Sequence, residues 1–225
     1  MAPIPDSNRP GAYLPALRWH ALTPLFDPAV RVTTRERTFK RRLLDLAAVQ
    51  PGEAVLDLGC GTGTLAIAQK RRRTDARVVG LDADPGVLAR ARAKAAADSQ
   101  EVELVEALST AVPFADASFD VVVSSLFFHH LEPAVKRATL AEVARVLKPA
   151  GRLHVADWGK PSDPFMRALF TTVRAFDGFG VTAENARGAL PDLFENAGLE
   201  QARVQEQVRT PLGTLAIYGA RKPSA

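Results

Sequence analysis

Cysteine is almost absent from this 225-residue sequence, and it contains no long apolar run. The single cysteine, Cys60, excludes an intramolecular disulfide and any metal site built from several cysteines. No stretch approaches the roughly 20 apolar residues that cross a bilayer, and the proline-rich first residues lack the apolar core of a secretion signal. We therefore expect a cytoplasmic protein without a transmembrane segment, for which transient contact with a membrane surface stays open.

A large excess of charge of one sign is also lacking. The 29 lysines and arginines against 25 aspartates and glutamates give a net charge of +4 at pH 7. The basic runs at 40–42 and 70–73 are short, and a solvated surface explains them better than a patch for an anionic partner. A nucleic-acid partner is therefore less favoured than a small molecule, and the length suits one sizeable core.

The first 32 residues combine prolines with scattered aromatic side chains. Tyr13, Trp19 and Phe26 predict an irregular segment that packs on another part of the chain. We expect residues 1–32 to form a lid over an acceptor or to cover an apolar sheet edge. Residues 33–225 then form a single domain, within which 159–185 is a substrate-side insertion.

From residue 33 onward, helical and extended patterns alternate. This alternation predicts parallel strands joined by helices, in a sheet covered on both faces. The last two extended segments are joined by only four residues, which predicts an antiparallel pair. The predicted strands are Ala54–Leu58, Arg77–Leu81, Glu101–Val105, Asp120–Ser124, Arg152–Ala156, Ala202–Arg209 and Thr214–Ala220, and the predicted helices are 33–49, Thr64–Lys70, Pro85–Ala97, Pro133–Leu147, Pro164–Phe176 and Ala186–Ala197.

The segment after the first strand carries the strongest functional signal. Gly59, Gly61 and Gly63 alternate directly after the strand, which lets the backbone turn sharply and approach a ligand. A dinucleotide turn has its third glycine at the position that Thr64 occupies here. With Asp57 two residues before the first glycine, the pattern instead favours a smaller ligand with a charged amino acid end.

Asp82 ends the second strand, 23 positions after Gly59. A carboxylate at this place accepts hydrogen bonds from both ribose hydroxyls of a nucleoside that lies over the strand ends. Alone, Asp82 would be read as a cap or surface residue. Together with the glycine turn it predicts a nucleoside-containing ligand.

Four segments, Val55–Ile67, Val78–Ala91, Phe119–Leu131 and Ala144–Trp158, resemble the successive motifs of the class I S-adenosylmethionine-dependent methyltransferases. The resemblance is to the small-molecule branch that includes the ubiquinone and menaquinone C-methyltransferases. It implies an α/β, Rossmann-like, doubly wound sheet of seven strands in the order 3-2-1-4-5-7-6, with strand 7 antiparallel. The implied cofactor is S-adenosylmethionine, with S-adenosylhomocysteine as product, and the implied cofactor-binding residues are Gly59, Gly61, Gly63, Asp82, Ala83 and Ser124. Further candidates for cofactor binding are Asp57, Cys60, Leu108 and Ser109.

The adenine end departs from the family pattern. Such proteins commonly place an acidic residue five positions before a Pro-Phe pair, and counting back from Pro113 reaches Leu108. We expect adenine to be held by backbone groups near Leu108 and Ser109 and by apolar contacts, with Glu106 as a substitute if the strand register shifts.

Three residues are candidates for the acceptor side, namely His129, His130 and Asp157. A histidine here could act as a general base or could only shape the loop. On an extended segment, consecutive histidines point in opposite directions, so at most one is expected to face the cleft. No third ligand has metal-site spacing, so no metal is expected. Asp157, ending the fifth strand on the same rim, could orient a substrate or cap a turn.

The function expected from these features is methyl transfer from S-adenosylmethionine to a small-molecule or lipid-like acceptor. Positioning and desolvation supply most of the catalysis of such a transfer, because the sulfonium already makes the methyl group electrophilic. A nucleic-acid methyltransferase, a catalytically silent S-adenosylmethionine-binding protein and a nicotinamide oxidoreductase stay as alternatives. The acceptor atom and the oligomeric state are left open by the sequence.

Overall fold

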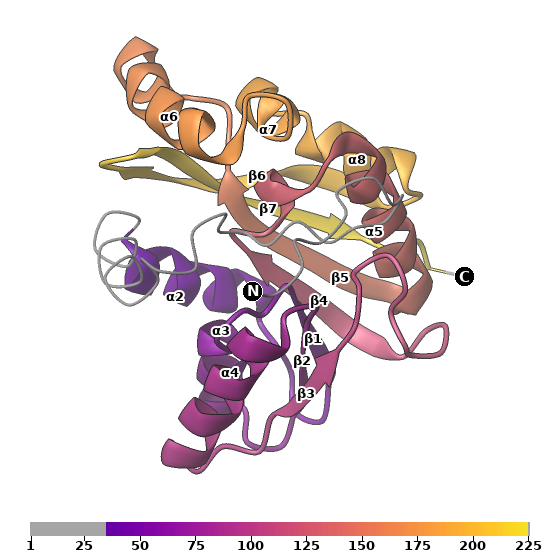
Figure 1. Cartoon of the computed structure of the whole chain (residues 1–225). Helices are drawn as coiled ribbons and strands as arrows, with labels where there is room; N and C mark the ends of the chain where they lie inside the picture. Colours follow the sequence, from indigo (N-terminus) through magenta and orange to yellow (C-terminus); the bar gives the residue numbers. More distant parts are fainter. Residues whose placement is uncertain (1–34, 225) are drawn as a thin grey trace, which may run out of the picture.

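The computed structural model describes residues 35–224, which form one seven-stranded sheet (Figure 1). The order is β3-β2-β1-β4-β5-β7-β6, with β7 antiparallel to both of its neighbours, so the predicted topology is confirmed. The pairs β1–β2, β1–β4, β2–β3 and β4–β5 are parallel. The strands are β1 (Ala54–Leu58), β2 (Arg77–Asp82), β3 (Glu103–Glu106), β4 (Phe119–Ser125), β5 (Leu147–Trp158), β6 (Glu200–Thr210) and β7 (Gly213–Arg221).

Helices surround this sheet, and the central strands feed a core on each face (Figure 1). Leu56 and Val122 point into one core, whereas Val55, Val121 and Val123 point into the other. Successive side chains of a strand alternate between faces, so a strand that is apolar at every position must be buried on both. The helices are α2 (Glu36–Ala47), α3 (Thr64–Arg72), α4 (Pro85–Ala97), the short 3-10 helix η2 (Phe128–His130), α5 (Pro133–Val146), α6 (Pro164–Asp177), α7 (Ala183–Arg187) and α8 (Leu190–Asn196).

Two elements differ from the sequence-based expectation. The single helix predicted over 186–197 is wrong, because Gly188 adopts φ +78° and ends α7 before α8 begins. The predicted helix ends at Leu147 and the predicted strand begins at Arg152, and the residues between them form a bulge of β5 instead of a connection. Ala150 has φ +61°, the β4–β5 register shifts there, and β5 begins directly after α5.

Side chains of the basic run at 70–73 form hydrogen bonds with neighbouring backbone carbonyls. Lys70 donates to the carbonyls of Thr74 and Ala76, and Arg73 donates to the carbonyl of Val49. These side chains close the end of α3 and are not arranged as a free patch. Between residues 35 and 224, no helix is both long enough and apolar enough to cross a bilayer.

Candidate active site

The glycine turn lies at the carboxyl end of β1, where it leads into α3. Gly59, Gly61 and Gly63 have φ values of +68°, +52° and +71°, a region that favours glycine. The N–H groups of Gly59 and Cys60 both donate to the carbonyl of Leu81 in β2, at 2.9 Å each. The turn is therefore tied to the strand that carries Asp82.

Lys94 of α4 holds the other side of the turn. Its ammonium group donates to the carbonyl and hydroxyl of Thr62 and to the hydroxyl of Thr64, at 2.9 to 3.0 Å. Sequence reasoning missed this residue, because the contact joins positions 30 and 32 residues apart on separate helical units. Three donated bonds fix the start of α3 next to the glycines.

The glycines of the turn differ in how much room their surroundings would leave for a side chain. A Cβ added to Gly59 would lie 2.3 Å from the ring of Phe127, so that glycine is required by packing. A Cβ added to Gly61 would meet nothing within 4 Å among the described residues. The open side of the turn is thus at Gly61, and a ligand can approach the backbone there.

Asp57 lies beneath the turn with one carboxylate oxygen unsatisfied. Its Oδ2 accepts from the N–H of Ala66 at 3.0 Å, whereas its buried Oδ1 has no hydrogen-bond partner within the part of the chain that is described. Burial raises the pKa of this carboxyl to about 7, although the Lys40 ammonium opposes the shift. An orphan acceptor in this position suits a cationic donor such as the ammonium group of S-adenosylmethionine.

Asp82 projects from the end of β2 next to Gly61. Its Oδ2 accepts from the N–H of Gly61 at 2.8 Å and its Oδ1 from the N–H of Asp84 at 3.0 Å. Burial raises the pKa of this carboxyl, and these backbone N–H groups oppose the shift. Each oxygen has a second acceptor position, so both remain able to bind a ribose hydroxyl.

Two further predicted cofactor residues, one in the turn and one at the end of β4, are buried. Ser124 of β4 is buried and its hydroxyl donates to the carbonyl of Leu58 at 2.7 Å, which links the ends of β1 and β4. Cys60 is 8% exposed, and burial raises the pKa of its thiol. Both residues shape the floor of the site.

The predicted adenine subsite lies beyond β3. The β2–β3 register is regular through the pair Asp82 and Glu106, so the register shift considered for Glu106 does not occur. Leu108 is 43% exposed, an unusual exposure for a large apolar side chain at the edge of a site. Ser109 is buried and shares a hydrogen bond of 2.8 Å with Thr139. The exposed apolar surface at this point suits the face of a base.

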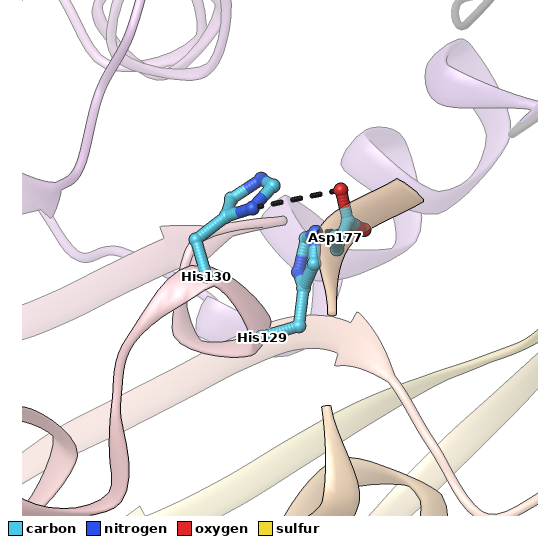
Figure 2. Close-up of side chains that lie close together, drawn as sticks. All are labelled: His129, His130 and Asp177. Atoms are coloured by element: carbon cyan, nitrogen blue, oxygen red, sulfur yellow. Dashed lines mark ion pairs between the residues drawn. The ribbon is translucent and has the colours of Figure 1, made fainter. Parts of the chain in front are cut away.

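The two histidines lie together on η2, after β4. Their ring centroids are 3.9 Å apart, and both imidazoles approach the carboxylate of Asp177 at the end of α6 (Figure 2). The prediction that at most one histidine faces the cleft assumed an extended segment, whereas this segment forms a 3-10 turn. The His129 side chain is buried, and the His130 side chain is 28% exposed.

Asp157 acts on this pair from inside the protein. It is fully buried, so the expectation that it opens onto the rim is also wrong. Its Oδ1 binds Nδ1 of His129 at 2.7 Å and accepts from the N–H of Trp158, and its Oδ2 accepts from the N–H of His129. It therefore orients an imidazole, which is a third role beside the two considered from sequence.

The pKa values in this cluster follow from burial and from neighbouring charges. Burial lowers the pKa of His129, but the carboxylates of Asp157 and Asp177 outweigh it and the net shift is upward. Burial, followed by the His129 charge, lowers the pKa of His130 to about 3. Burial raises the pKa of Asp177.

Asp177 was missed by sequence reasoning. It lies 47 positions after His130, inside the segment 159–185, and only the packing of α6 brings it near η2. The one available signal was its place directly before Gly178, where a helix is expected to end. The sequence shows no third ligand-type side chain near the histidines, and the fold places the Asp177 carboxylate beside them.

Known proteins resemble this chain in sequence and in fold. A methyltransferase-domain family model matches residues 55–151. A demethylmenaquinone methyltransferase of Thermus thermophilus is 42% identical over 142 residues, which cover 62% of this chain and 64% of the relative. One of Deinococcus radiodurans is 31% identical over 170 residues, covering 75% of this chain and 69% of that protein.

The fold is shared with solved structures. The crystal structure of a SAM-dependent methyltransferase from Methanosarcina mazei superposes with a TM-score of 0.64 at 20% identity, covering 79% of this chain and 95% of the other. The sheet order, the glycine turn and the two acidic strand ends define a Rossmann-like protein of the kind that binds a nucleoside cofactor. The chain belongs to the class I S-adenosylmethionine-dependent methyltransferases, in the group of the quinone methyltransferases.

Proposed function

We propose that the protein transfers a methyl group from S-adenosylmethionine to a small-molecule or lipid-like acceptor. The observation that carries the proposal is the open turn at Gly61 between two acidic strand ends. Asp57 offers an unsatisfied buried oxygen there, and Asp82 offers free acceptor positions beside it. A ligand with a cationic amino acid end and a ribose matches both.

The cofactor roles are assigned by position. Asp57 faces the ammonium end, Asp82 binds the ribose hydroxyls, and the N–H groups of the turn lie along the methionine portion. When bound, S-adenosylmethionine supplies a methyl group on a positively charged sulfur. The chain contributes positioning and exclusion of water, which are the main requirements of such a transfer. The remaining cofactor contacts are proposed for Gly59, Cys60, Gly63, Ala83, Leu108, Ser109 and Ser124.

The acceptor is proposed to lie against η2 and α6. His129 and His130 line this side, and Asp157 positions His129. Phe176 and Phe179 beside Asp177 are 84% and 52% exposed, which supports an apolar acceptor that they would cover. Residues 1–32 and 159–185 are proposed to enclose it, although Tyr13, Trp19 and Phe26 lie outside the described residues.

The names of the curated relatives support a quinone-type acceptor for this chain. The test is incubation of the purified full-length chain with methyl-labelled cofactor, with reduced quinones of several tail lengths, and in parallel with a metabolite extract. Label transferred to an extractable small molecule is expected. Bound S-adenosylhomocysteine without transfer to any acceptor would contradict the proposal and indicate a catalytically silent binding protein.

A further inference from the structure

Two imidazoles and one carboxylate converge on the acceptor side of the sheet (Figure 2). The Nε2 of His129 lies 3.7 Å from one oxygen of Asp177, and Nδ1 of His130 lies 3.9 Å from the other. One ligating atom from each of the three residues lies within 4.8 Å of the others. Both separations to Asp177 exceed the length of a hydrogen bond. The three groups therefore face a common gap that they do not close by bonding to one another.

Asp157 fixes His129 in the form that ligates a metal. Because a carboxylate only accepts hydrogen bonds, the bond of 2.7 Å places the proton on Nδ1 of His129. In the neutral imidazole, the lone pair of Nε2 then lies on the other side of the ring, toward Asp177, and a metal ion that binds there displaces the proton of the charged form. Metal-binding histidines are almost always held by a carboxylate or carbonyl in this way.

We propose that His129, His130 and Asp177 bind one divalent transition-metal ion, with Asp157 as the positioning residue of His129. Two imidazoles and one carboxylate are a donor set typical of zinc, iron and related ions in sites that keep an open position. Ligands at about 2.1 Å in a tetrahedral arrangement lie about 3.4 Å apart. The separations of 3.7 and 3.9 Å from Asp177 to the two imidazoles therefore need to shorten by only a few tenths of an ångström. Asp177 ends its helix beside Gly178, a residue whose backbone tolerates such an adjustment.

The charges around the gap suit a cation. The carboxylates of Asp157 and Asp177 both act on His129. The cation Lys136 also acts on it, but its ammonium group is engaged by the carboxylate of Glu184 at 3.3 Å and by the carbonyl of Val181 at 2.7 Å. The side chains of His130 and Asp177 are 28% and 20% exposed, which leaves the gap open to an ion and to a further ligand.

The role of this ion in turnover rests on the proposed methyl transfer, whereas its binding does not. An acceptor oxygen bound at the open position has its pKa lowered and is held on the side of the sheet where the transfer takes place. The acceptor class that this site favours is a molecule with a hydroxyl or phenolic oxygen.

The test is a titration of the untagged, EDTA-treated full-length chain with Zn²⁺ in a calorimeter, with Co²⁺ absorption as the second readout. The variants are Asp177→Asn and His130→Ala, both at partly exposed positions, and the control is Asp163→Asn at the other end of α6. Wild type and Asp163→Asn are expected to bind one ion per chain with equal affinity. Each of the other two variants is expected to bind at least tenfold more weakly.

If wild type does not bind Zn²⁺, or if Asp177→Asn and His130→Ala bind Zn²⁺ as tightly as wild type, the proposed metal site is overturned. S-adenosylmethionine binding, measured on the same samples, reports that each variant is folded. Intact cofactor binding without Zn²⁺ binding overturns the metal site alone. Loss of cofactor binding by wild type overturns the proposed function, and the Zn²⁺ titration still decides the metal site.

Discussion

Asp57 and Asp82 end neighbouring parallel strands, yet their surroundings differ. Asp82 receives a backbone N–H on each oxygen, whereas Asp57 is fully buried and receives one N–H from the residues between 35 and 224. A buried carboxylate with an unsatisfied oxygen destabilises the ligand-free fold at neutral pH. The oxygen that causes this cost is also the one that we propose as the acceptor for a cationic ligand.

Because the Asp57 carboxyl is buried, the effect of Asp57→Asn on stability is expected to depend on pH. The folded-state pKa of about 7 exceeds the ordinary value of 3.8, so the contribution of Asp57 to stability is present below about pH 4 and is lost as the pH rises through 7. The variant lacks this titration. Its free energy of unfolding relative to wild type is therefore expected to be higher at pH 8 than at pH 5 by roughly 2 to 3 kcal/mol. Urea unfolding at both pH values measures the change, and an equal difference at both would contradict it.

Asp82→Asn is expected to weaken S-adenosylmethionine binding by about 10- to 100-fold, because hydrogen bonds to a charged acceptor contribute about 1.5 to 3 kcal/mol. The matched control is Asp84→Asn, two residues later, since asparagine also caps the start of α4. Calorimetric titration of both variants checks the prediction. Equal affinities for the two would argue against a ribose at Asp82.

Two glycines that flank β1, one before the strand and one in the turn after it, form a matched pair of positions. Gly61 and Gly52 both have positive φ and open space where a Cβ would be, but they lie at opposite ends of β1. Alanine at either is expected to cost about 1 kcal/mol of stability from backbone strain. Only Gly61→Ala is expected to weaken cofactor binding, and thermal unfolding with and without S-adenosylmethionine separates the two effects. A cofactor-induced rise in Tm as large in Gly61→Ala as in Gly52→Ala would show that the ligand does not approach there.

A buried lysine joins α5 to the segment that holds Asp177. The ammonium group of Lys136 donates to the carbonyl of Val181 and the side chain of Asn185, and it pairs with Glu184. Lys136→Met is expected to destabilise the protein by about 3 to 5 kcal/mol, because it leaves Glu184 buried without this partner. Lys148→Met is the control, since its pair with Asp120 is partly exposed and contributes about 0 to 1 kcal/mol. Denaturant unfolding measures the loss of stability in both variants. Equal losses would contradict the conclusion that Lys136 joins α5 to the segment that holds Asp177.

At the scale of the whole molecule, the predictable parts are those set by neighbouring residues. β1 and α4 begin and end at the predicted residues, because a buried apolar run and the Asp84–Pro85 start are local signals. The sheet order came from the family resemblance and is confirmed. The predicted ends of β5 and the single helix predicted over 186–197 were wrong. The true ends of β5 depend on a bulge, and the division into α7 and α8 depends on one left-handed glycine.

The acceptor side was less predictable for a physical reason. The pairs His129–Asp157 and His130–Asp177 join residues 28 and 47 positions apart, and each depends on the packing of separate elements. Asp157 was selected as a candidate, but its action through His129 was not foreseen. The Lys94 clamp on Thr62 has the same long-range character. Asp57, the glycine turn and Asp82, by contrast, lie within two consecutive strand–turn–helix units that the sequence displays directly.

We propose above all that the turn at Gly61, with Asp57 and Asp82, binds S-adenosylmethionine. Calorimetric titration of the full-length chain with S-adenosylmethionine, S-adenosylhomocysteine and NAD tests it most directly. We expect the chain to bind one equivalent of each adenosyl ligand and not to bind NAD. Absence of heat with both adenosyl ligands, in a sample that shows a cooperative thermal transition, would contradict it.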